Sequence, residues 1–238
     1  MPKRLEAIKA FVKAKSELLY YVGYGLLIIT FFAKDSFRDS LKDKIQDQSA
    51  AIDRHKAATK RIEDKEAAYA VSARFEQSMR PQNQEPDLTY FARALSHKLE
   101  QALMYVSDAV EFAKEAPDKK LLGEANDLEQ QSRSTTSISY QLIHQIALMN
   151  SGNIPHPVGD AETKYMTDFN RAVHSEIEIM NSSVKLTNDI EENIHKAQES
   201  ERAQLTKIGI FINVVFCLGW LIGLIGHISG VRELPRPT

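Results

Sequence analysis

The chain has 238 residues, 26% of them charged, and a formal net charge of −2 at pH 7. A balance so close to neutral argues against nucleic acid as the main partner, because nucleic-acid-binding domains carry a strong basic excess. The single cysteine, Cys217, excludes a disulfide or a cysteine-based metal site in the polar part of the chain.

Residues 1–17 form a basic segment with five Lys and Arg residues. Leu5, Ile8 and Val12 fall on one helical face. Two interpretations follow: a basic cytoplasmic flank that extends the next helix, or a helix that lies on an anionic membrane surface.

An apolar run, LLYYVGYGLLIITFFA, follows at residues 18–33. As a helix it is about 24 Å long, which is short for a bilayer. The exit TFFAKDS lacks the small-x-small pattern of signal-peptide cleavage. We therefore expect an uncleaved first transmembrane helix here.

The segment 34–207 predicts a helical domain, because its apolar residues recur with a period near 3.5. The basic flanks described below predict that this domain is extracytoplasmic. Turns are expected at PQNQEP (81–86), at Ala116-Pro117 and at SGNIPHPVGD (151–160), and Asp118 is a candidate N-cap. The expected helices cover about 35–80, 87–115, 119–150 and 161–206.

The expected fold class is all-α: two transmembrane helices flank a long antiparallel four-helix bundle with a coiled-coil-like stalk. The membrane-distal half of the first bundle helix is the more apolar half, through Val71, Phe75 and Met79. Its proximal half is interrupted by polar residues, which predicts the stalk. In the last bundle helix the expected core face consists of Met166, Phe169, Val173, Ile177, Met180, Val184, Ile190, Ile194 and Leu205.

A second apolar run predicts a transmembrane helix at 208–228, followed by a tail at 229–238. Ile208–Gly226 holds nineteen residues without a formal charge, and a helix of that length spans about 28 Å. The flanks 1–17 and 229–238 together carry seven Lys and Arg residues. The positive-inside rule then predicts a multi-pass protein of the inner or plasma membrane with both termini cytoplasmic.

The polar run QQSRSTTSISYQ (130–141) places Ser132, Thr135 and Ser139 where the heptad pattern expects apolar side chains. Such hydroxyls can bond back to carbonyls of their own helix or meet water. The alternative, which we take as the candidate ligand-binding site, is a polar cavity inside the bundle.

The second apolar run carries a small-residue face, and such faces let helices approach closely. We expect it to pack within the monomer or in a homodimer, and self-association of this helix through this face, weakened by Gly219→Ile or Gly223→Ile, is predicted. Asn213, a strongly polar side chain in the run, needs an interhelical hydrogen bond or a water path. The expected packing residues are Gly219, Gly223, Gly226, Gly230 and Asn213.

Catalytic and metal signatures are not found in the sequence. None of the seven histidines pairs as HxxxH, and no Ser-His-Asp order or phosphate-binding glycine loop occurs. We therefore expect no enzyme activity, no catalytic residue, no metal and no cofactor.

The layout resembles the sensory half of two-span bacterial chemoreceptors: a short basic N-terminus, an uncleaved first span, a four-helix extracytoplasmic bundle and a second span. The resemblance is architectural and covers residues 1–230, without matching ligand-binding motifs. That family continues into a long cytoplasmic signalling region, whereas VRELPRPT follows Gly230 here. Any signal would then need a partner protein.

Three functions remain open at this point. The first is a membrane-anchored sensor or interaction module that binds outside the membrane and signals through a membrane or cytoplasmic partner. The second is an oligomeric membrane effector or channel, and the third is a structural scaffold or tether. The expected partners are the lipid bilayer, further copies of the chain and the partner protein.

Overall fold

The structure is a computed structural model that describes residues 2–79 and 88–231. Within these ranges all regular elements are helical, which confirms the all-α fold class. The expected turn at 81–86 and residues 232–238 of the expected tail lie outside the described residues. The elements are α1 (Pro2–Ala14), α2 (Ser16–Ala33), the π-helical segment η1 (Lys34–Asp39), α3 (Ser40–Ser78), α4 (Leu88–Ala113), α5 (Lys119–Asn150) and α6 (Asp160–Val231).

Local chemistry explains several of the helix ends. The side chain of Asp118 accepts a 2.9 Å hydrogen bond from the backbone N–H of Lys120, which confirms the N-cap of α5. Gly152 and Gly159 have φ values of +73° and +63°, a conformation that glycine adopts without steric cost, and they lie in the connection to α6. No proline interrupts 160–231, so the expected helices at 161–206 and 208–228 are one continuous helix, α6.

The exit from the first apolar run differs from a plain α-helix. Helices α2 and α3 are joined by the six π-helical residues Lys34–Asp39, so the helix expected at 35–80 starts with a π segment. Such segments are rare and short, and no sequence pattern used above predicts them.

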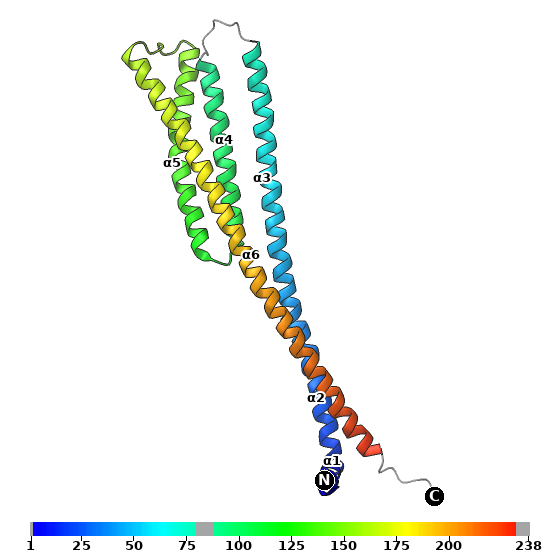
Figure 1. The fold of residues 1–238 in the computed structure, drawn as a ribbon. Coiled ribbons are helices and arrows are strands. Elements are labelled where there is room, and N and C mark those ends of the chain that lie inside the picture. Colours follow the sequence, from blue (N-terminus) through cyan, green and yellow to red (C-terminus); the bar gives the residue numbers. More distant parts are fainter. Residues whose placement is uncertain (1, 80–87, 232–238) are drawn as a thin grey trace. The chain divides into compact units, whose positions relative to one another are not determined.

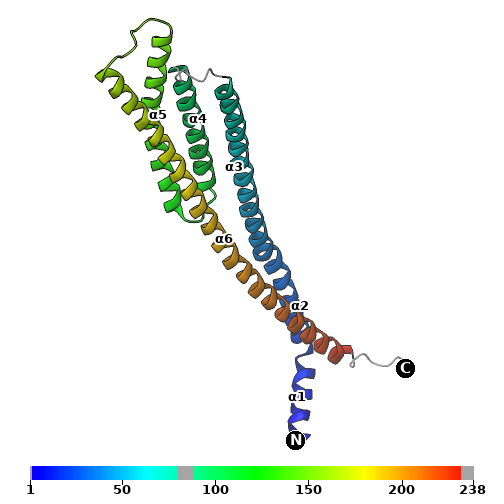
Figure 2. The ribbon, with the colours of Figure 1, turned by 45° about the horizontal axis from the view of Figure 1, so that its top comes forward.

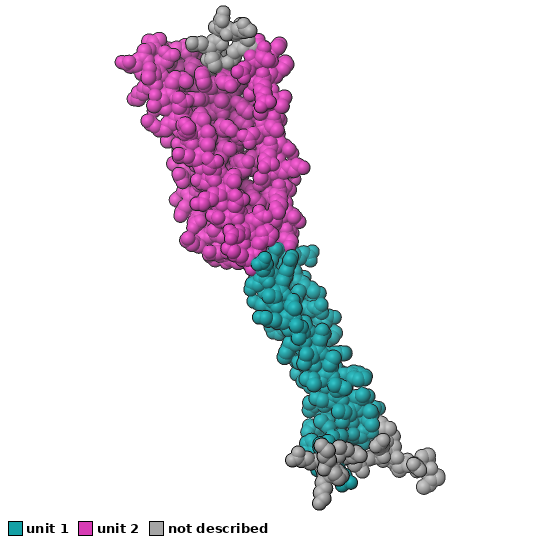
Figure 3. All heavy atoms as spheres, in the orientation of Figure 1, with its two compact units in different colours: residues 1–47, 198–238 teal, residues 48–197 magenta. Residues whose placement is uncertain are grey.

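The chain divides into two compact units, coloured separately in Figure 3. Unit 1 comprises residues 1–47 and 198–238, and unit 2 comprises residues 48–197. The start of α3 and nearly half of α6, from Gln198 onward, therefore belong to unit 1. Unit 2, residues 48–197, is therefore shorter than the helical domain expected at 34–207.

Unit 2 is built around a core to which α3, α4, α5 and α6 all contribute. Helices α4 and α5 lie side by side in both ribbon views (Figure 1 and Figure 2). The largest buried cluster includes Ile52 of α3, Val106 and Phe112 of α4, Leu128 of α5, and Ile179, Leu186, Ile190 and Ile194 of α6.

The apolar far half of α3 does not face this core. Val71, Phe75 and Met79 are 68%, 64% and 71% exposed, whereas Ile62 is 2% exposed. Nine residues separate Ile62 from Val71, and at 100° per residue this places the two side chains on roughly opposite faces of the helix. These three side chains of the apolar far half therefore lie outside the core, whereas Tyr69 of the same half is partly buried.

The expected core face of α6 is confirmed at Phe169, Ile190 and Ile194, but between them the buried positions are shifted by about one residue. Val184 is 40% exposed, and the fully buried positions nearby are Glu176, Ile179 and Ser183. The core of α6 therefore combines large apolar residues with the polar side chains of Glu176 and Ser183, which an apolar pattern passes over.

Two helices are long and apolar enough to cross a membrane. The first is the continuous helical stretch Ser16–Ser78, and the second is Asp160–Ser229. In their most apolar windows only 17% and 6% of the residues are buried. A core helix of a globular protein would be mostly buried, so these surfaces remain available to an apolar solvent.

Candidate functional site

Two of the three hydroxyl groups predicted to line a cavity are buried in unit 2. Ser132 and Ser139 are 1% and 0% exposed, and Thr135 is half-buried. Thr135 Oγ1 donates a 3.3 Å hydrogen bond to the carbonyl of Gln131 in its own helix. Thr135 thus shows the back-bonding alternative, while Ser132 Oγ makes no hydrogen bond to a described residue.

Ser139 contacts an acidic side chain that the sequence patterns did not reveal. Its hydroxyl donates a 2.6 Å hydrogen bond to Oε1 of Glu176, and Oε2 of Glu176 has no partner among the described residues. Burial raises the pKa of the Glu176 carboxyl above its ordinary value, and the hydrogen bond from Ser139 opposes part of this rise. The pair forms a buried polar contact between α5 and α6.

A hollow lies elsewhere in unit 2, along α3 and α4. This α3–α4 groove has a volume of about 680 Å³ and is bordered by side chains from 51–62 and from 100–115. Pockets of a few hundred to a thousand Å³ are the usual size of ligand sites. Its apolar part consists of Ala51, Ala58, Ile62, Leu103, Met104 and Phe112.

A histidine–aspartate pair holds one wall of the groove. His55 Nδ1 and Asp108 Oδ2 are 2.6 Å apart, and their side chains are only 10% and 11% exposed. The imidazole ring of His55 also stacks on Phe112, with ring centres 4.3 Å apart and planes inclined by 7°. These contacts fix the side chains on both helices, so the wall is preorganised.

The rim of the groove is charged and carries more acidic than basic groups. Besides Asp108 of the buried wall, three carboxylates (Glu100, Glu111 and Glu115) and two guanidinium groups (Arg54 and Arg61) border the hollow. Arg54 lies 3.3 Å from Glu115, which satisfies one cation, whereas no described acidic residue pairs with Arg61. Glu100 and Glu111 pair with Lys65 and Lys114 in exposed, weak contacts, which a ligand with positive charge at its edges can replace.

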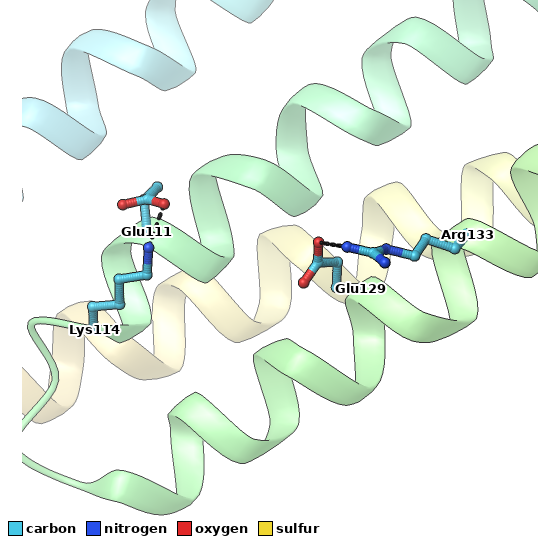
Figure 4. Close-up of polar contacts among 4 residues, drawn as sticks. All are labelled: Glu111, Lys114, Glu129 and Arg133. Carbon is cyan, nitrogen blue, oxygen red and sulfur yellow. Dashed lines mark hydrogen bonds and ion pairs between the residues drawn. The ribbon is translucent and has the colours of Figure 1, made fainter.

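Ion pairs within single helices contribute little to this site. Figure 4 shows two of them, Glu111 with Lys114 next to the groove and Glu129 with Arg133 on α5, the latter at 2.8 Å. All four side chains are at least 40% exposed, and exposed pairs contribute at most about 1 kcal/mol. Glu111 is therefore free to exchange Lys114 for another cation.

A smaller hollow of about 230 Å³ shares Ile62, Glu100 and Met104 with the groove. Here Tyr69 and His97 stack with their ring centres 3.6 Å apart. Burial lowers the pKa of His97 and raises that of Tyr69, so both side chains favour their neutral forms. The groove thus continues over a flat aromatic pair.

The predicted glycine face of unit 1 packs against α2 of the same chain. A Cβ atom on Gly23 would lie 2.4 Å from the backbone nitrogen of Gly223, and one on Gly226 would lie 2.5 Å from that of Tyr20. One on Gly219 would lie 3.0 Å from the Gly23 carbonyl oxygen. The face therefore serves packing within the chain, which was one of the two expected uses, and is not free for a second α6.

Asn213 does not take part in this packing. Its side chain is exposed and makes no hydrogen bond to a described residue, whereas the neighbouring Ile212 is buried. Gly230 is part of α6, but its packing lies outside what the structure describes. The interhelical hydrogen bond expected for Asn213 is thus not made within the described chain.

Sequence reasoning missed the α3–α4 groove because its walls combine two helices whose lateral spacing no pattern encodes. A signal for the groove was available in the two alanine pairs Ala50-Ala51 and Ala57-Ala58 of α3, because small side chains leave space next to a neighbouring helix. Among the described residues no group of three or more His, Cys, Asp or Glu side chains is placed to hold a metal ion.

Comparison of the chain with protein families, with curated proteins and with solved structures finds no match.

Proposed function

We propose that this protein is a membrane-anchored interaction module that binds a partner in the α3–α4 groove of unit 2. The carrying observation is the 680 Å³ groove, with its apolar floor and its wall fixed by His55 and Asp108. A scaffold or tether would need no such hollow. The proposed activity is binding without catalysis.

The membrane anchors in this proposal are α2 and the C-terminal part of α6. Both are long and apolar enough to span a bilayer, and their glycine contacts are of the kind that brings membrane helices together. Both termini are cytoplasmic and unit 2 is extracytoplasmic, as the basic flanks suggest. Unit 2 is an antiparallel four-helix bundle, supported by the core that its four helices share.

The partner in this proposal presents an amphipathic helix with basic residues. The groove runs along residues 100–115, which as helix cover about 22 Å, or four turns. A helix laid into a groove places apolar residues on the floor and polar ones at the rim. The acidic excess of the rim complements lysine or arginine at the edges of that helix.

Site-specific photocrosslinking in intact cells tests the proposal. Ser107 lines the groove, whereas Ser137 is an exposed residue of α5 outside it. A photoreactive amino acid at Ser107 should give one discrete adduct with a protein that contributes a basic amphipathic helix, and the same group at Ser137 should give none. Equal adduct patterns from the two positions, or none at Ser107, would refute the proposal.

A further inference from the structure

The second apolar segment presents a face that α2 covers only in part, at its His227 end. Asn213, Cys217, Trp220, Leu224 and His227 are spaced by four and three residues along α6, so they share one side of the helix, and all five are exposed. The side that contacts α2 is different, because it carries the buried residues Ile212, Gly219 and Gly226.

Asn213 makes this face unsuited to lipid alone. A primary amide has two N–H donors and a carbonyl acceptor, and the exposed Asn213 side chain makes no hydrogen bond to a described residue. Removing such a group from water without a hydrogen bond is unfavourable, so polar side chains of membrane helices bond across to other helices. The carboxamide is self-complementary: two copies related by a twofold axis can each donate to the other.

The same face also borders a hollow. A hollow of about 220 Å³ lies between α2 and α6, where Tyr20 and Tyr24 meet Trp220, Leu224 and His227. The last three residues belong to the exposed face as well. An isologous interface needs such self-complementary relief, because each copy supplies both the projecting and the receiving part.

We propose that the Asn213 face of α6 binds a second copy of this chain, with the two Asn213 carboxamides hydrogen-bonded to each other. This inference rests on the proposed function in one respect only, namely that α6 lies in a bilayer. It assigns homodimerisation to a face separate from the glycine contacts, which hold α2 and α6 of one chain together.

The native Cys217 tests this proposal without an added probe. It is the sole cysteine of the chain and lies one turn from Asn213 on the same face. The full-length chain is reconstituted in phosphatidylcholine vesicles, and resistance to carbonate extraction verifies insertion. Copper-phenanthroline oxidation should then convert most of the protein to a disulfide-linked dimer.

Three variants make the result specific. Asn213→Leu should lower the dimer yield about fivefold, in keeping with the loss of interhelical hydrogen bonds, and Asn213→Gln should retain it. Moving the thiol by one residue, in the double variant Cys217→Ala, Leu218→Cys, turns it about 100° around the helix and should abolish crosslinking.

Three results with a carbonate-resistant chain overturn the homodimer and leave the groove proposal intact. The chain stays monomeric, it crosslinks equally from positions 217 and 218, or its crosslinking is unchanged by Asn213→Leu. A monomer of this kind would leave lipid chains as the occupant of the hollow. A chain extracted by carbonate overturns both proposals.

Discussion

The Ser139 hydroxyl on α5 donates a 2.6 Å hydrogen bond to Oε1 of Glu176 on α6, and both side chains are 0% exposed. Burial raises the pKa of this carboxyl, so the folded chain holds a proton that the unfolded chain releases more readily. Folding is thereby linked to pH through a single buried acid.

Glu176 should make unit 2 less stable as the pH rises from about 4.5, the ordinary value for glutamate. Above this pH the unfolded chain loses the proton while the folded chain keeps it, so the free energy of unfolding falls until the folded pKa is reached. Glu176→Gln keeps the hydrogen-bond geometry and removes the titration. Denaturant unfolding in detergent, followed by circular dichroism, should show that the free energy of unfolding of the variant increases relative to that of wild type as the pH rises. A pH-independent difference would contradict this account.

The two buried serines of α5 should respond to substitution with opposite signs. Ser132→Ala removes an unpaired buried hydroxyl and should stabilise the chain by roughly 1 kcal/mol. Ser139→Ala leaves Glu176 without its hydrogen-bond donor and should cost about 1–3 kcal/mol. The same unfolding experiment measures both changes, with Thr135→Val as a near-neutral control. Equal effects of the two serine variants would show that their environments do not differ.

Gly23 should be sensitive to a single added methyl group. In Gly23→Ala the new Cβ would lie 2.4 Å from the backbone nitrogen of Gly223, so α2 and α6 must separate. Gly25→Ala is the matched control, because nothing lies within 4 Å of its Cβ position. Fluorescence of Trp220, the sole tryptophan, reports the separation. The sodium dodecyl sulfate content at which α2 and α6 separate should fall for Gly23→Ala alone. An equal shift for both variants would argue against the contact between Gly23 and Gly223.

Sequence periodicity predicted the helical class and, through the heptad, the inward direction of Ser132 and Ser139. It could not predict Glu176, because a single acidic residue between apolar positions looks like an exposed one. Glu176 lies seven residues after Phe169 and seven before Ser183, so helix geometry places all three on one buried face. The exposure of Val71 was missed for the converse reason. An apolar residue raises the average hydropathy of α3 even where it lies on the face that points away from the core.

Topology can be tested with cysteines placed singly at Ser151 and at Glu6 in a Cys217→Ala background. Both positions are exposed, one in the connection before α6 and one in α1. If both termini are cytoplasmic, a membrane-impermeant maleimide should label the Ser151→Cys chain in intact cells and the Glu6→Cys chain only after lysis. The reverse labelling would invert the orientation.

The central claim, that the α3–α4 groove is the binding site, is tested most directly by filling the groove. Ala58 borders the hollow, whereas the neighbouring Ala57 is exposed and does not. Ala58→Trp should abolish the photoadduct formed from position 107 while leaving the unfolding transition unchanged, and Ala57→Trp should preserve the adduct. An adduct of unchanged yield in the Ala58→Trp chain would contradict the assignment of the groove.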